Sequence, residues 1–152
     1  MNLEFQKLTL QLEEKFQKLI SMKPFVAEAV PSGTPKGGIY LFSEKGVHLY
    51  AGRTKRKIDV RIRGHFSTGK DCPFAWRLAR EETGCLATYK QEGSRNDLLL
   101  QPKFYQAYEA AKQKIRKMDV RFVEEADPLR QALLEIYVAV VAGAKHNDFD
   151  TH

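Results

Sequence analysis

The chain is 152 residues long, 43% of them hydrophobic, and it carries a formal charge of +6 at pH 7 with a pI near 9.3. This length holds one compact domain with a sizeable core and is too short for two ordinary domains, so we expect a single domain over residues 1–152. The composition excludes a disordered chain, and the positive charge favours an anionic partner such as nucleic acid.

Cysteine usage and hydropathy bear on the compartment. Cys72 and Cys85 lie in no Cys-x-x-Cys pair or metal-type cluster, so we expect neither a disulfide framework nor a zinc finger, and a reducing cytoplasm fits. The segment 1–23 has acidic residues among its apolar ones, unlike the core of a signal peptide. The longest nearly uncharged run, 131–144, is shorter than the ~20 residues of a bilayer span. We therefore expect a soluble cytoplasmic protein that binds no membrane.

The first part of the chain predicts a helix and then a β-hairpin. Segment 1–23 is predicted to be an amphipathic helix, because apolar residues recur in it at steps of three and four. The Pro- and Gly-rich stretch 31–38 interrupts regular structure. Residues 38–43 and 48–52 are rich in β-branched and aromatic side chains and flank a Glu-Lys-Gly turn, which predicts two paired strands.

The middle of the chain predicts helices. Residues 57–66 have apolar side chains four apart, which indicates a helix with one buried stripe. Helical patterns also cover 73–83 and, more clearly, 102–118, whose basic end suits a helix C-terminus. The stretch between them, 84–97, is predicted to be irregular.

The last part of the chain predicts a strand followed by a helix. Residues 119–125 alternate in polarity, and we expect this strand to join the hairpin in one sheet. Asp127 followed by Pro128 is typical of a helix start, and the helix is predicted to run to about Ala144. The elements together predict an α/β domain with a small three-stranded antiparallel sheet packed with helices.

Two tyrosines of the hairpin form the first candidate pair. A turn centred near Lys45 places Tyr40 and Tyr50 roughly opposite each other on one face of the paired strands. Either tyrosine alone is more often a half-buried packing residue. As a pair, they present two phenols to one surface.

The basic run after the hairpin provides the cations. Arg61 and His65 lie four apart beside the buried stripe of 57–66, where a fixed cation and a titratable imidazole border the core. In the alternative interpretation, Arg61 and Arg63 belong to a solvated basic helix face that contacts phosphates. Both interpretations indicate nucleic acid. The candidate substrate-binding residues of this run are Arg53, Lys55, Arg56 and Arg63.

Glu135 carries the only formal charge in residues 131–144. An isolated buried carboxylate is costly, so it needs a metal ion, an arginine or contact with water. A structural ion pair or a solvent-facing position is the more common outcome for such a residue, and a metal ligand is the functional alternative.

The order of these residues resembles the GIY-YIG endonuclease superfamily. The matching residues are Gly38-Ile39-Tyr40, Tyr50-Ala51-Gly52, an arginine on a basic helix, a lone glutamate on a later helix and Asn147. The resemblance covers 37–147, and it implies a catalytic core with β-β-α-α-β-α order to which 1–23 adds an N-terminal helix.

The resemblance also implies roles for individual residues. Tyr40 or Tyr50 orients or deprotonates the attacking water. His65 matches the tyrosine or histidine that lies one turn after the arginine, and it is a candidate catalytic residue that can relay the proton. Arg61 matches the catalytic arginine, with Arg63 as its rival because the spacing is one residue longer than is common. Arg53 matches an auxiliary cation.

Two further positions complete the implied site. Glu135 matches the ligand of a single Mg²⁺ or Mn²⁺. Asn147 matches a bracing asparagine, and the alternative for this end of the chain is a mere tail with Phe149 tucked into the core. The expected function is a metal-dependent endonuclease that hydrolyses DNA phosphodiesters. Alternatives are a catalytically inactive nucleic-acid-binding domain or a subunit of a larger DNA-processing assembly, and the choice between DNA and RNA stays open.

Overall fold

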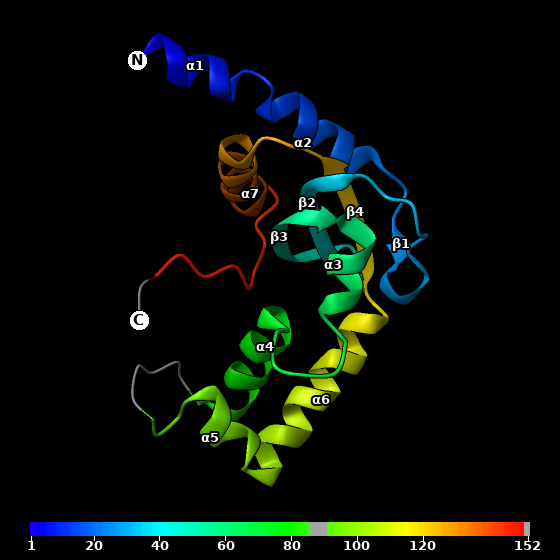
Figure 1. Ribbon diagram of the computed structural model, residues 1–152, viewed down its shortest axis with the longest axis vertical. Coiled ribbons are helices and arrows are strands. Elements are labelled where there is room, and N and C mark those ends of the chain that lie inside the picture. Colours follow the sequence, from blue (N-terminus) through cyan, green and yellow to red (C-terminus); the bar gives the residue numbers. More distant parts are fainter. Residues whose placement is uncertain (86–90, 151–152) are drawn as a thin grey trace.

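The computed structural model describes residues 1–85 and 91–150, which form an antiparallel sheet of four strands packed with helices (Figure 1). The strands are β1 (Phe25–Val26), β2 (Lys36–Glu44), β3 (Val47–Lys57) and β4 (Asp119–Glu124). The helices are α1 (Leu3–Thr9), α2 (Leu12–Ser21), α3 (Ile58–Gly64), α4 (Pro73–Thr83), α5 (Arg95–Leu99), α6 (Pro102–Arg116) and α7 (Pro128–Val141). Within the described ranges, no helix combines the length and apolar character needed to cross a bilayer.

The sheet has the strand order β1-β4-β2-β3, so β3 forms an edge and β4 pairs with the hairpin as predicted. The prediction of three strands is wrong because a fourth, β1, adds to the outer side of β4. β1 contains two residues, Phe25 and Val26, which are too few to show any alternation of polarity.

The hairpin is longer than predicted, and its register corrects the expected pairing of the tyrosines. Lys45 and Gly46 both have positive φ, 51° and 78°, as a two-residue turn of the hairpin type requires. Tyr40 pairs with Gly52, and Tyr50 pairs with Phe42. The two tyrosines are therefore diagonal neighbours on one face and not directly opposite.

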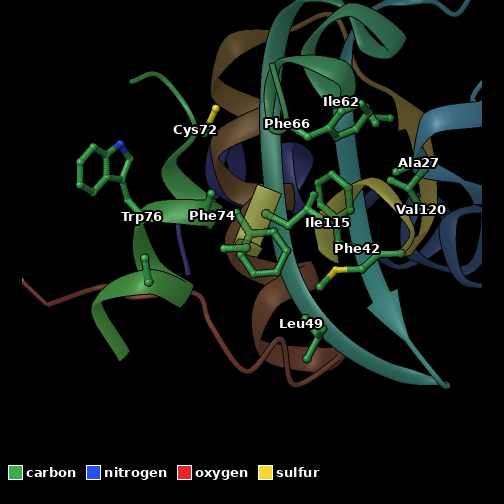
Figure 2. Close-up of a cluster of buried hydrophobic side chains, with 14 of the residues drawn as sticks. Ala27, Phe42, Leu49, Ile62, Phe66, Cys72, Phe74, Trp76, Ile115 and Val120 are labelled. Atoms are coloured by element: carbon green, nitrogen blue, oxygen red, sulfur yellow. The ribbon is translucent and has the colours of Figure 1, made fainter. Parts of the chain in front are cut away.

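Each face of the sheet has its own hydrophobic cluster. Ile39 and Leu41 of β2 pack with residues of α2 and α7. Tyr40 and Phe42 point to the other face, where they join residues of α3, α4 and α6. Figure 2 shows Phe42 within this cluster. Figure 1 shows α4 and α6 side by side in a layer beyond α3. The sheet is thus enclosed by helices on both faces.

The N-terminal segment differs from its prediction. The expected single helix over 1–23 is two helices, with a break at Leu10 and Gln11 between α1 and α2. Asn2 caps α1 through its side chain, but α1 has no buried residue. α2 buries Phe16 and Leu19 against the sheet and α7.

The remaining helices follow the predictions with shifted ends. α4 has its predicted bounds, and α7 begins at Pro128 with Asp127 as its N-cap, accepting from the Arg130 amide. The stretch 84–97 was predicted to be irregular; residues 86–90 of it lie outside the described residues, and its last residues begin α5.

Candidate active site

Tyr40 is fully buried, and its hydroxyl lies against the backbone of β3. A Cβ atom placed on Gly52 would be 2.3 Å from Tyr40 Oη, so no residue with a side chain fits beside this phenol. The hydroxyl and His65 Nε2 are hydrogen-bonded at 2.6 Å. Burial raises the pKa of Tyr40, the Tyr50 charge adds to this, and the nearby Arg61 opposes it. Tyr40 is therefore a neutral phenol fixed behind the surface.

His65 is the C-cap residue of α3 and has no exposed surface. Burial, and then the charge of Arg61, lower its pKa to about 3. Its ring contacts both tyrosines, with centroids 5.2 Å from Tyr40 and 5.6 Å from Tyr50. Its Nδ1 has no hydrogen-bond partner among the described residues. His65 is thus a neutral group that holds Tyr40 in place, and it is more buried than a border position implies.

Tyr50 is the tyrosine that reaches a cleft. Its ring stacks on Phe74 of α4, with centroids 4.7 Å apart and planes 8° apart. Burial raises its pKa to about 12, the charge of Glu135 contributes in the same direction, and Arg61 opposes both. The pKa of Tyr50 therefore depends on an acid of α7 and a cation of α3.

The two candidate arginines of α3 point to different surroundings. The side chain of Arg61 is 17% exposed, and its Nη1 lies 3.5 Å from Asp71 Oδ2. Its charge acts to lower the pKa of both tyrosines. Burial lowers the pKa of Arg61, but Tyr40, Asp71 and Tyr50 together outweigh this effect and the pKa is raised. Arg63 instead pairs with Asp59 at 2.8 Å and donates to the Val30 carbonyl. The structure places Arg61, and not Arg63, beside the tyrosines.

Glu135 of α7 lies at the edge strand β3. Its Oε2 is 3.1 Å from Arg53 Nε, and the two side chains are 26% and 47% exposed. Burial raises the pKa of Glu135, and the charge of Arg53 partly offsets this. The ion pair is the structural alternative expected for this residue, and water reaches both partners.

Asn147 clamps the chain after α7 onto β3. Its Oδ1 accepts from the Ala51 amide at 2.8 Å, and its Nδ2 donates to the Ala51 carbonyl at 2.9 Å. This side chain mimics a strand partner at the residue that follows Tyr50. Phe149 is 60% exposed, so the alternative in which it enters the core is wrong.

A cleft of about 720 Å³ opens beside these residues. Three of the predicted site residues line it: Tyr50, Glu135 and Asn147. Tyr40, Arg61 and His65 are not among its lining residues and lie behind Tyr50, as their contacts show. The other lining residues are Pro73, Trp76, Arg77, Arg80, Glu81, Arg95, His146, Asp148, Phe149 and Asp150.

Three arginines that line the cleft, Arg77, Arg80 and Arg95, were not among the predicted site residues. Arg77 and Arg80 lie three apart on one predicted helix, a spacing that places them on one face and could have indicated a basic surface. Arg95 follows a stretch without periodicity and had no such signal. Lys55 and Arg56 are exposed at the end of β3 and do not line the cleft.

The donor set bears on a possible metal. Within residues 1–85 and 91–150, no three His, Cys, Asp or Glu side chains group as a metal site. Glu135 is a single-carboxylate candidate. Mg²⁺ commonly binds through one or two carboxylates together with waters and phosphate oxygens, so the residues present fit a hard cation bound along with a phosphate substrate.

No family model, curated protein or solved structure matches this chain. The resemblance to the GIY-YIG superfamily therefore rests on the residues themselves. The structure gives a physical reason for glycine at positions 38 and 52. A Cβ atom on Gly38 would be 2.2 Å from the Val123 carbonyl oxygen, and a Cβ atom on Gly52 would collide with Tyr40.

Proposed function

We propose that this chain is a divalent-metal-dependent endonuclease of the GIY-YIG type that hydrolyses DNA phosphodiester bonds. One observation carries the proposal: Tyr50 and the half-buried carboxylate of Glu135 line one cleft and interact electrostatically, although 85 residues separate them in the chain. Free Cys72 and Cys85 fit the cytoplasmic location that the proposal assumes.

Tyr50 is the group assigned to the attacking water, because Tyr40 has no access to the cleft. A phenol with a pKa of about 12 does not ionise appreciably at neutral pH, so Tyr50 orients the water by hydrogen bonding and gives up its proton only as positive charge accumulates nearby. The Tyr40–His65 hydrogen bond and the Phe74 stack keep the phenol oriented.

The cations stabilise the negative charge of the transition state. Arg61 is assigned to a non-bridging phosphate oxygen, since it already lies beside both phenols. Arg53 is the auxiliary cation, and the exposed Lys55 and Arg56 extend the basic surface toward the rest of the substrate. Arg63 contributes less to this surface than predicted, because it is paired with Asp59. Glu135 would hold a divalent cation, which when bound would supply neutralisation of the negative charge on the phosphate and on the leaving 3′ oxygen.

Plasmid nicking by the purified protein with Mg²⁺ or Mn²⁺ tests this function. We expect the wild type to convert supercoiled DNA to nicked circles, Glu135→Gln to be inactive, and Arg61→Ala to lose about 100-fold in rate. Lys103→Ala, which removes an exposed cation that does not line the cleft, is the control and retains activity. Absence of nicking by the wild type, or equal nicking by Glu135→Gln, contradicts the proposal.

A second candidate function is a nucleic-acid-binding domain without catalysis. The Arg53–Glu135 ion pair favours it, because the arginine occupies the carboxylate that the nuclease needs. This alternative predicts DNA binding that weakens with salt, as counterion release requires, and no strand scission with either metal. Scission that begins only after a partner protein is added would instead indicate a subunit of a larger assembly.

A further inference from the structure

Trp76 of α4 is one of the residues that line the cleft. The ring is 2% exposed, stacks on Phe104 at 5.3 Å and lies 4.6 Å from Tyr108. Its Nε1 donates to the Lys70 carbonyl at 2.7 Å. In Figure 2 Trp76 projects from α4 away from the sheet. A ring buried in this way cannot stack on a nucleic-acid base, but one of its faces can support charged groups.

Two guanidinium groups lie over the Trp76 ring. Arg80 of α4 is 5.7 Å from the ring centroid, and Arg95 of α5 is 5.2 Å from it. Arg80 also donates to the Cys85 carbonyl, and Arg95 donates to the same Lys70 carbonyl that Trp76 uses. Cation–π contacts and bonds to neutral carbonyls orient a guanidinium without cancelling its charge.

The charge balance of Arg95 differs from that of Arg77, which also lines the cleft. Arg77 is neutralised by Glu81 at 2.7 Å and by Asp148 at 2.9 Å. For Arg95, no carboxylate of residues 1–85 or 91–150 lies within 4.0 Å of the guanidinium. The pKa of Arg80 is lowered by burial and also by the charge of Arg95. Two mutually repelling cations are thus held together at the cleft.

We infer that Arg80 and Arg95, supported by Trp76, form an anion subsite that binds a backbone phosphate of the nucleic-acid strand whose scissile phosphate lies at Tyr50 and Glu135. The inference rests on the proposed function for the identity of the ligand. Guanidinium groups present planar donor forks that match phosphate oxygens, and a phosphate between two of them relieves their repulsion. Both residues line the same cleft as Tyr50 and Glu135, so one strand can contact both ends.

Trp76 is the single tryptophan of the sequence, which makes its fluorescence a direct reporter of this subsite. The experiment titrates a short duplex DNA into Glu135→Gln protein, which binds without cutting. We expect a saturable change in Trp76 fluorescence. Adding Arg95→Ala weakens binding about tenfold, reduces the fluorescence change, and lowers the slope of log affinity against log salt by about one.

Lys103→Ala in the same Glu135→Gln protein is the matched control, since it removes one exposed cation from the same group of helices outside the cleft. Equal affinity and salt slope for the Arg95→Ala and Lys103→Ala proteins would overturn the inference. Inorganic phosphate is titrated in parallel, and saturation by phosphate at lower concentration than by DNA would overturn the assignment to a nucleic-acid strand. Arg95 is exposed, so its replacement leaves the fold intact, and a second variant, Arg80→Gln, should weaken binding as Arg95→Ala does.

The outcome separates this inference from the nuclease proposal. If the wild type fails to nick plasmid but DNA binding still depends on Arg95, the subsite stands and the protein only binds. If the wild type nicks plasmid and Arg95→Ala nicks with unchanged kcat and KM, the nuclease stands and the subsite is wrong.

Discussion

Gly52 is the residue on which the position of the Tyr40 hydroxyl depends. Its Cα hydrogen faces Tyr40 Oη where any Cβ would be 2.3 Å away. We expect Gly52→Ala to displace the phenol from His65, to lower the free energy of unfolding by about 1–3 kcal/mol and to reduce nicking. Urea denaturation measures the change in the free energy of unfolding.

Gly64→Ala is the matched control for Gly52→Ala. At Gly64, the nearest atom to an added Cβ is Arg61 Nη1 at 3.8 Å, an ordinary contact. This change in a helix should be neutral or stabilising by up to about 1 kcal/mol. Equal effects of the two substitutions would show that the close approach at Gly52 is not what excludes a side chain there.

Glu135 combines a functional position with an unfavourable environment. Burial raises its pKa, so its charge is disfavoured in the fold, and its partner Arg53 is exposed enough to be solvated without it. We expect Glu135→Gln to abolish nicking and to stabilise the protein slightly, by about 1 kcal/mol or less, as replacement of active-site charges often does. Thermal unfolding followed by circular dichroism measures the change. A loss of more than about 2 kcal/mol would instead support the structural ion pair.

His65 makes stability depend on pH. Its pKa is about 3 in the fold, below its usual value of 6.5, so the unfolded chain binds a proton first as the pH falls. The stability it contributes is complete above pH 6.5 and is lost between that pH and about 3, with a slope of up to ~1.4 kcal/mol per pH unit.

His65→Gln should remove this part of the pH dependence. His48 and His146 also have pKa values lowered by burial and add slopes of the same sign, so the test is the difference between variant and wild type. Unfolding free energies from urea titrations at neutral and mildly acidic pH give that difference. Parallel curves for the two proteins would show that His65 is not protonated on unfolding.

At the scale of elements, α4 is joined to the sheet through Phe74. This side chain is fully buried, stacks on Tyr50 and lies 5.6 Å from Phe42. We expect Phe74→Ala to cost about 3–5 kcal/mol, because it leaves a cavity between the helix and the hairpin, and to reduce nicking by releasing Tyr50. Chemical denaturation tests this. Leu100→Ala, at an exposed position, should change stability by less than about 0.5 kcal/mol.

The elements that the sequence predicted well are those with a local signal. β2, β3 and β4 have β-branched and aromatic runs, and α7 has the Asp127-Pro128 start. β1 has no signal of its own, because its pairing comes from β4. The break between α1 and α2 lies in a continuous apolar pattern without Gly or Pro, so the periodicity alone could not predict it.

The sequence could indicate which residues belong to the candidate site, but not how their side chains are arranged. Asp59 and Arg63 are four apart, and this spacing already indicates the ion pair that removes Arg63 from the tyrosines. The Arg53–Glu135 contact and the two-residue offset between Tyr40 and Tyr50 depend on how α7 and the hairpin turn are placed. These are tertiary properties, and no spacing in the sequence encodes them.

At the scale of the whole molecule, the hairpin connects two hydrophobic clusters. Neighbouring residues of β2 alternate between them, with Ile39 and Leu41 in one and Tyr40 and Phe42 in the other. The molecule carries a net charge of +6. The cleft opens between α4 and the segment that follows α7. Binding groups from distant parts of the chain are therefore positioned by one sheet.

This alternation has a consequence for changes in chain length. Deleting one residue inside β2 would exchange every side chain beyond the deletion between the two clusters, so that the phenol and the imidazole partner no longer meet. Removing or adding a residue at the Lys45-Gly46 turn leaves the inward and outward order of each strand intact. In a scan of single-residue deletions along the hairpin, we therefore expect deletions within the strands to prevent folding and deletions at the turn to be tolerated. Such a result would show that the alternation of side chains between the two faces matters more than the identity of the residues.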